Sequence, residues 1–357
     1  MGSQDQGWRG LERLQRRGLL PGDPQPGDSP PDRVRVRRSG FPHVRALRLR
    51  LTPLPESPIL EIVRKLRDPG YPAIAIGHRG DSQNAPENTL AAFRKAIEAG
   101  AQMVEFDIRQ AASGELVVIH DERVDRTTDG QGEVSKLDLE AMREFSAGAW
   151  FAPEFASERI PTLDEVLDLC VKGRCVPMVE IKGKTKAQPD VAERVAQALA
   201  KHGISEASIV IPKDPQRAAQ LQEHTPQTPL CYLSLTKGQA RSAMKIPGVF
   251  GADIYWKSLS LGLVQELRSD NRFLTPWTVN RGRDMDRILE LGVVAMITDC
   301  PVTLLDRIEG FEFSRSASLV EAFARGEQED VDFEIEVALE DDEPGLSESH
   351  VELDESE

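Results

Sequence analysis

Nine short apolar runs, separated by turns and amphipathic helical patterns, occupy residues 72 to about 310 of this 357-residue chain. Short aliphatic runs bounded by turn residues are typical of buried strands, and their alternation with helices indicates a parallel sheet. The stretch also has the usual size of a (β/α)8 barrel. We therefore predict an α/β fold, a TIM (β/α)8 barrel. The candidate strands are 74–76, 103–108, 116–119, 176–179, 208–211, 230–233, 253–256, 273–277 and 295–298.

The second and third runs depart from strict alternation. About seven residues separate Ile108 from Leu116, with a Ser-Gly turn at 113–114, whereas a parallel crossover needs a dozen or more. The two runs therefore form a hairpin, or the barrel is irregular at this point. Because nine runs compete for eight places, we expect a somewhat distorted barrel.

Residues 122–160 follow the third run without a clear strand–helix unit. We predict that they form a small insertion after the third strand, near the barrel mouth. Its aromatic residues either anchor a long loop or contact substrate, and the sequence leaves both readings open. These residues are Trp150, Phe151 and Phe155.

Capping residues mark two helix starts. Asn88 or Thr89 precedes an amphipathic pattern that Gly100 ends. Thr162 and Glu165 have the spacing of a capping box, in which each side chain bonds the other residue's backbone N–H. Helices are therefore expected after residues 89 and 162.

Two histidines stand where strand-like runs end. His78 and Arg79 follow the first run, between glycines at 77 and 80, and His120 follows the third. In α/β folds the carboxyl ends of strands are where chemistry is assembled. Two histidines near neutral pH can divide the roles of general base and general acid.

Three carboxylates lie within or at the end of apolar runs. Glu105 and Asp107 are two residues apart, as are Glu180 and Lys182, and side chains so spaced share one face of a strand. An exposed strand face is the simpler reading, but unpaired buried carboxylates are costly. A hard divalent cation, Mg²⁺ or Ca²⁺, would resolve this cost. With Arg79 and Lys182 to balance phosphate charge, the set indicates metal-assisted cleavage of a phosphate ester.

The chain resembles the glycerophosphodiester phosphodiesterase family. The likeness lies in an ordered series of motifs over roughly residues 72–310, at 75–80, 85–89, 105–107, 120–121, 126–130, 149–151, 159–163, 180–182, 277–280 and 297–299. It implies a TIM-barrel enzyme that hydrolyses glycerophosphodiesters to sn-glycerol 3-phosphate and an alcohol through a cyclic phosphate. By position it implies metal ligands at Glu105, Asp107 and Glu180, an acid–base pair at His78 and His120, and phosphate contacts at Arg79 and Lys182.

Two features of the barrel mouth bear on the substrate. Trp277 ends a candidate strand and either forms an apolar wall of the substrate pocket or serves only in packing. Residues 209–213 lack the Ser-Phe-like pair that many family members carry after the fifth strand, which leaves the substrate contacts of that loop open. The sequence does not assign base and acid between the two histidines.

Two other functions stay open. The same groups could serve a lysophospholipase-D-like hydrolysis of lysophospholipids, which a longer apolar groove would favour. The barrel could also be a non-catalytic scaffold that acts through its charged ends.

The two ends of the chain differ from the middle. Residues 1–52 hold eleven arginines and no lysine, so we predict a mostly disordered arginine- and proline-rich leader over 1–70, with a short helix at 56–67. A transit peptide or a contact with an anionic membrane is an alternative. Residues after 325 hold fifteen acidic residues and no lysine or arginine, equal to the net charge of −15. We predict a disordered acidic tail over 313–357, which could pair loosely with the leader, and a catalytic domain over 71–312.

Composition limits the partners and the compartment. The acidic chain has no basic face for nucleic acid, and no apolar run approaches the length of a membrane span. Its four cysteines match neither a disulfide framework nor a zinc site. We predict buried thiols in a cytoplasmic enzyme with a small-molecule substrate; peripheral membrane contact and the oligomeric state stay open.

Overall fold

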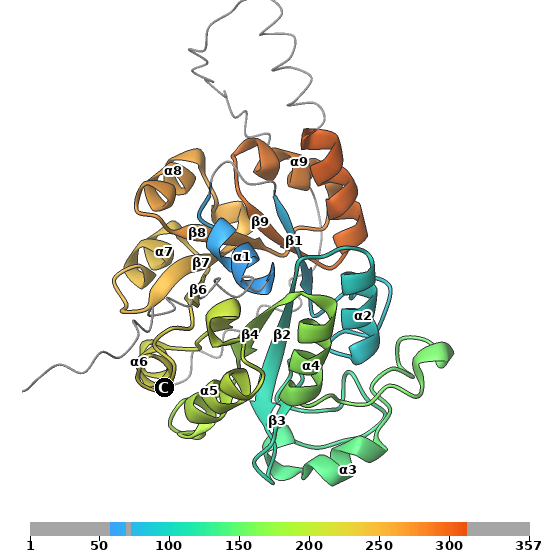
Figure 1. Ribbon diagram of the computed structural model, residues 1–357. Helices are drawn as coiled ribbons and strands as arrows, with labels where there is room; N and C mark the ends of the chain where they lie inside the picture. The colour runs from blue at the N-terminus through green and yellow to red at the C-terminus, as the bar shows by residue number, and fades with distance from the viewer. Residues whose placement is uncertain (1–57, 69–72, 313–357) are drawn as a thin grey trace, which may run out of the picture. The chain divides into compact units, whose positions relative to one another are not determined.

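The computed structural model describes residues 58–68 and 73–312 (Figure 1). Its sheet has the strand order β8-β7-β6-β5-β4-β2-β1-β9, with every neighbouring pair parallel. β8 and β9, at the two ends of this order, lie next to each other. The eight parallel strands therefore form a nearly closed barrel with helices around it, as predicted. Residues 1–57 of the predicted leader and the predicted acidic tail at 313–357 lie outside the described residues.

The strands agree with the predicted apolar runs. The largest difference is β7, which begins four residues before the predicted start because Val249 already pairs with β6. The strands are β1 (Ile74–His78), β2 (Met103–Gln110), β3 (Leu116–Val118), β4 (Val176–Ile181), β5 (Ile209–Ile211), β6 (Leu230–Ser234), β7 (Val249–Tyr255), β8 (Phe273–Trp277) and β9 (Ala295–Thr298).

The surplus ninth strand is β3. It pairs antiparallel with β2, Ile108 opposite Val118, and lies outside the order of the eight barrel strands. The hairpin reading is therefore confirmed. The segment between β3 and helix α4 (Leu163–Gly173) is the predicted insertion and packs around a small apolar cluster that includes Ile119 and Met142. It contains η2 (Val134–Lys136), α3 (Leu139–Glu144) and η3 (Pro153–Phe155).

The helices begin where the capping residues predict. Thr89 caps α2 (Leu90–Glu98) by accepting from the Ala92 N–H, and Thr162 and Glu165 form the capping box of α4. Gly100, with a φ of 100°, follows the last turn of α2. The remaining helices complete the ring in Figure 1. They are α2 (Leu90–Glu98), α4 (Leu163–Gly173), α5 (Val191–Lys201), α6 (Pro215–His224), α7 (Lys237–Ala243), α8 (Leu261–Ser269) and α9 (Gly282–Glu290), with η4 (Ser205–Ala207) and η5 (Trp256–Ser258), and residues 301–312 are also helical.

Helix α1 (Pro58–Lys65) confirms the short helix predicted at 56–67. It lies over the centre of the ring of strands in Figure 1 and buries Ile59 and Val63 against the barrel core, where Leu66, just after the helix, is also buried. It also contacts η4, which precedes β5. Helix α1 therefore covers the amino ends of the strands.

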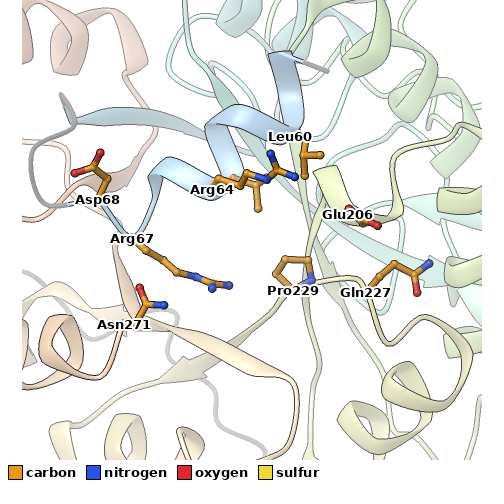
Figure 2. Close-up of a pocket in the computed structure, with 9 residues that line it drawn as sticks. Leu60, Arg64, Arg67, Asp68, Glu206, Gln227, Pro229 and Asn271 are labelled. Carbon is orange, nitrogen blue, oxygen red and sulfur yellow. The ribbon is translucent and has the colours of Figure 1, made fainter. Parts of the chain in front are cut away.

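A cavity of about 450 Å³ lies beside α1 (Figure 2). Its other walls come from residues that precede strands β5, β6 and β8, so the cavity is at the amino ends of the strands. Arg67 points into it in Figure 2. The lining residues are Leu60, Val63, Arg64, Arg67, Asp68, Glu206, Gln227, Pro229 and Asn271.

The four cysteines are buried free thiols, as predicted. Among the described residues, no helix has the length and apolar character required to span a membrane.

Candidate active site

Strand register brings the predicted residues together. His78, the last residue of β1, is the register partner of Glu105 on β2. Asp107 on the same strand is the register partner of Glu180 on β4. Three adjacent strands therefore place a histidine and three carboxylates at the carboxyl end of the barrel.

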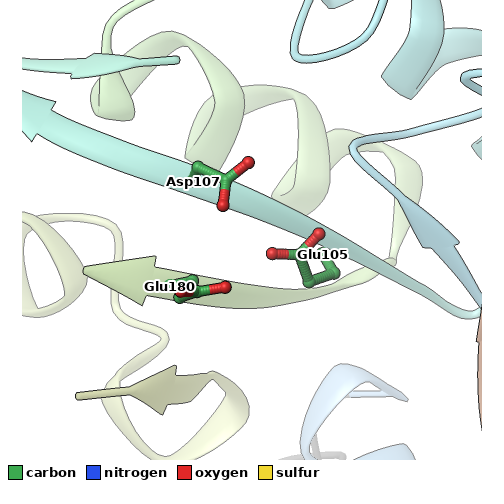
Figure 3. Close-up of side chains that lie close together, drawn as sticks. All are labelled: Glu105, Asp107 and Glu180. Carbon is green, nitrogen blue, oxygen red and sulfur yellow. The ribbon is translucent and has the colours of Figure 1, made fainter. Parts of the chain in front are cut away.

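The three carboxylates form one cluster (Figure 3). Glu105, Asp107 and Glu180 can each offer one oxygen such that all three oxygens lie within 4.8 Å of one another. Glu105 and Asp107 are buried, and Glu180 is partly buried. Carboxylate oxygens are the ligands preferred by Mg²⁺ and Ca²⁺. The cluster could hold a metal ion, as the sequence predicted.

Two cations lie against this cluster. Lys182 Nζ is 3.1 Å from Asp107 Oδ1 and 2.5 Å from Glu180 Oε1. Arg79 Nε is 3.1 Å from Asp107 Oδ2, an ion-pair distance without the alignment of a hydrogen bond. Both predicted phosphate contacts therefore lie beside the proposed metal ligands.

The three carboxylates are not equivalent electrostatically. Burial, with Asp107 and Glu180 nearby, raises the pKa of Glu105 well above its ordinary value. Burial alone would also raise the pKa of Asp107, but Lys182 and Arg79 hold it far below its ordinary value. Negative charge is thus in excess at Glu105, which accepts a hydrogen bond from the Arg79 backbone N–H (3.3 Å). A cation bound here would relieve that excess, so the residues fit a divalent metal.

Each histidine is oriented by an aspartate. His78 Nδ1 is 2.6 Å from Asp299 Oδ1, and its Nε2 is 4.0 Å from Glu105 Oε2. His120 Nδ1 is 2.7 Å from Asp121 Oδ1. Because a carboxylate can only accept, each Nδ1 carries a proton and each Nε2 is the atom that can exchange one.

The orienting aspartates are themselves held. Asp299 accepts hydrogen bonds from Ser82 (3.0 Å) and from Asn280 Nδ2 (2.6 Å). Burial would raise its pKa, but the hydrogen bond from His78 contributes to lowering it to about 2. For Asp121, burial acts in the same direction, and hydrogen bonds from His120 and Arg126 hold its pKa below its ordinary value. Both aspartates therefore stay ionised at neutral pH.

Sequence reasoning assigned no role to several residues of this network. Asn88, with a φ of 57°, donates from Nδ2 to Asp107 Oδ2 at 2.9 Å. Glu87 accepts from Arg79 at 2.8 Å. A signal was present, because Glu87, Asn88, Asp121 and Asp299 all lie inside the motifs at 85–89, 120–121 and 297–299.

The aromatic residues divide into two groups. Trp277, at the end of β8, packs against Tyr255 with ring centroids 5.8 Å apart, and its buried Nε1 has no hydrogen-bond partner among the described residues. Phe155 packs against the start of α2, and a chain of ring contacts joins it through Phe151 to Trp150. This packing favours the loop-anchoring reading for the insertion.

Comparison with known proteins gives a consistent family. A model of the Glycerophosphoryl diester phosphodiesterase family matches residues 78–303. A glycerophosphodiester phosphodiesterase of Caldanaerobacter subterraneus is 35% identical over 237 residues, which are 66% of this chain and 97% of that protein. Glycerophosphodiester phosphodiesterase 1 of Mus musculus is 41% identical over 133 residues, 37% of this chain and 39% of its own.

Solved structures agree on the fold. A phosphodiesterase from Oleispira antarctica, in complex with its product sn-glycerol-3-phosphate, superposes with a TM-score of 0.64. It is 23% identical, and the match covers 67% of this chain and 97% of that one. An Agrobacterium tumefaciens glycerophosphodiester phosphodiesterase gives a TM-score of 0.57 at 25% identity, over 65% of this chain and 98% of that one. Neither the lysophospholipase-D-like reading nor the scaffold reading finds support in these matches.

Proposed function

The chain belongs to the glycerophosphoryl diester phosphodiesterase family and is a glycerophosphodiester phosphodiesterase, and we propose that it works by metal-dependent catalysis with two histidines. The products would be sn-glycerol 3-phosphate and an alcohol. The observation that carries the proposal is the meeting of two aspartate-oriented histidines and a buried carboxylate cluster at one end of the barrel.

The divalent cation, Mg²⁺ or Ca²⁺, would be held by Glu105, Asp107 and Glu180. When bound, it would neutralise negative charge on the phosphate that is cleaved. Arg79 and Lys182 would contact the phosphate oxygens, a role supported by their positions beside Asp107.

The histidines would move the protons. In the first step the glycerol 2-hydroxyl oxygen attacks phosphorus while its proton passes to the neutral Nε2 of one histidine. The bond from phosphorus to the alcohol oxygen breaks, and that oxygen takes a proton from Nε2 of the other, protonated histidine. Water then opens the cyclic phosphate with the two roles reversed. Attack within one molecule gains from proximity, with effective molarities on the order of 10⁵ M or more.

Trp277 would form an apolar wall for the substrate. Its position at the carboxyl end of β8 beside Tyr255 supports this role. The sn-glycerol-3-phosphate bound in the Oleispira antarctica structure supports a small-molecule substrate. The cytoplasmic location stays a prediction from the sequence.

The test is release of sn-glycerol 3-phosphate from glycerophosphocholine by the full chain. We expect activity that EDTA abolishes and that added Mg²⁺ or Ca²⁺ restores. Activity unchanged by EDTA would contradict the assignment of the carboxylates to a metal. Hydrolysis of a lysophospholipid without hydrolysis of glycerophosphocholine would contradict the assignment of glycerophosphodiesters as the substrate.

A further inference from the structure

Arg126 lies on the insertion after β3 and binds two carboxylates at once. It donates from Nε to Asp121 Oδ2 (2.6 Å) and from NH2 to Asp121 Oδ1 (3.0 Å). It also donates from NH1 to Glu87 Oε2 and from NH2 to Glu87 Oε1, both at 2.8 Å. Each carboxylate is therefore held by two parallel bonds, the geometry that a planar guanidinium supplies and an ammonium does not.

The first carboxylate leads to a catalytic histidine. Asp121 Oδ1 takes the Nδ1 hydrogen bond of His120 while Arg126 contacts both oxygens of the same carboxylate. These two bonds restrain the orientation of the Asp121 carboxylate and, through its hydrogen bond to Nδ1, the orientation of the imidazole ring. Arg109 adds a second restraint by donating to the backbone carbonyl of His120 at 2.8 Å.

The second carboxylate leads to the proposed phosphate contact. Glu87 Oε1 accepts from Arg79 NH1 at 2.8 Å, and the side chain of Glu87 is only 14% exposed. Burial would raise the pKa of Glu87, but hydrogen bonds and charges from Arg126 and Arg79 lower it. Arg79 in turn lies against Asp107 of the carboxylate cluster.

We propose that Arg126 is a positioning residue that sets the orientations of His120 and Arg79 together. It acts through Asp121 and Glu87, and this inference rests on the proposed function. Arg126 would thereby connect the insertion to the turn that carries Glu87, close to His120. Loss of the guanidinium would free the Asp121 carboxylate to rotate. Glu87 would keep its hydrogen bond from Arg79 and lose those from Arg126.

The experiment compares R126A and R126K with R123A. Arg123 is a matched control because it lies on the same loop and makes an exposed ion pair, in which its Nε and NH2 both donate to Asp125 Oδ2. We expect R126A to lower kcat roughly 10- to 100-fold, the range found when a group that orients a metal-ligating residue is lost, with a smaller change in KM. R123A should keep wild-type kcat.

Two readouts separate positioning from a general structural effect. R126K should stay near R126A, because an ammonium cannot make both bidentate pairs. Millimolar guanidinium should restore part of the kcat of R126A and leave R123A unchanged. Full activity in R126K would mean that only the charge matters and would overturn the inference, as would full activity in R126A.

A double variant keeps the test decisive if R126A folds poorly. If Arg126 acts on His120 through Asp121, R126Q in a D121N background should cost far less than R126Q in the wild type. Additive losses would overturn the inference. Failure of the proposed function can be told apart from failure of this inference. If His120 takes no part in catalysis, H120A retains activity; if only the role of Arg126 is wrong, H120A is inactive while R126A is not.

Discussion

Arginine side chains at the two ends of the barrel have opposite surroundings: carboxylates at one end, and an aromatic ring with a second arginine at the other. At the carboxyl ends of the strands, Arg79 is partly buried among Asp107, Glu87 and Glu105, and these carboxylates raise its pKa against the effect of burial. At the amino ends, the Arg67 guanidinium lies 4.4 Å from the Phe250 ring centroid. The Arg272 guanidinium lies 5.4 Å from the same ring, and burial together with Arg272 lowers the pKa of Arg67.

The proposed active site does not coincide with the larger of two cavities in the part of the chain that the structure describes. The cavity of about 450 Å³ lies at the amino ends, whereas the hollow beside His120 measures about 10 Å³. What distinguishes the carboxyl ends is a dense set of opposite charges whose pKa values are pushed apart, as is typical of active sites. Four predictions test this contrast.

The largest effect is expected from the histidines. H78A and H120A should each lower kcat by about 10²-fold or more, because a positioned acid or base is lost, while the thermal unfolding midpoint stays near that of the wild type. Initial rates of sn-glycerol 3-phosphate release and a melting curve measure both. H224A, which changes an exposed histidine at the end of α6, is the control. A variant at 78 or 120 that keeps wild-type kcat would remove that residue from the acid–base pair.

The next effect concerns the carboxylate cluster. E180Q should raise the Mg²⁺ or Ca²⁺ concentration needed for half-maximal activity by roughly tenfold or more, because a neutral amide replaces one charged ligand. Excess cation should recover part of the rate. E206Q, at the edge of the amino-end cavity, should leave the metal titration unchanged. An unchanged titration in E180Q would separate Glu180 from the metal.

A smaller effect concerns the pH dependence of stability through Asp299. Its pKa is lowered from 3.8 to about 2 in the folded chain, so its contribution to stability is present above the unfolded value and lost as pH falls towards 2. The difference in denaturant midpoint between wild type and D299N should be constant above about pH 5 and shrink below pH 4. A difference that stays constant down to the lowest pH at which both proteins fold would contradict this assignment.

The smallest effect is expected at the amino ends. R67A should leave kcat and the metal titration unchanged, since the cavity lies at the opposite end of the strands from the site. The lost contact with Phe250 and the relieved repulsion from Arg272 oppose each other, so the free energy of unfolding should change by less than about 1 kcal/mol. A severalfold fall in kcat would show that the two ends are coupled.

Local patterns in the sequence account for most of the fold. Strand runs, the capping box at Thr162 and the short β2–β3 connection each depend on residues close in sequence, so they could be predicted. The grouping of Glu105, Asp107 and Glu180 was also predictable. Period-two spacing places residues two apart on the same face of a strand, and the carboxyl ends of neighbouring strands meet at one end of the barrel. The metal ion and the roles of the histidines stay predictions.

The partners of these residues could not be predicted in the same way. Asp121 follows His120 directly, yet adjacency alone does not say that the carboxylate turns back to Nδ1. Asp299 and His78 are 221 positions apart, and their contact depends on β9 pairing with β1. The link from Arg126 to Glu87 spans 39 positions between an irregular insertion and a turn, where no periodic pattern applies.

The pairing of β1 with β9 also sets an order of events during synthesis. A chain that has emerged only as far as β8 already carries both histidines, the three carboxylates, Arg79 and Lys182. It lacks Asp299, the hydrogen-bond partner of His78 Nδ1 in the folded chain. Contacts of such long sequence separation are slow to form, because the loop between them must first be closed. The incomplete polypeptide should therefore be inactive, and the appearance of activity should report that folding is complete.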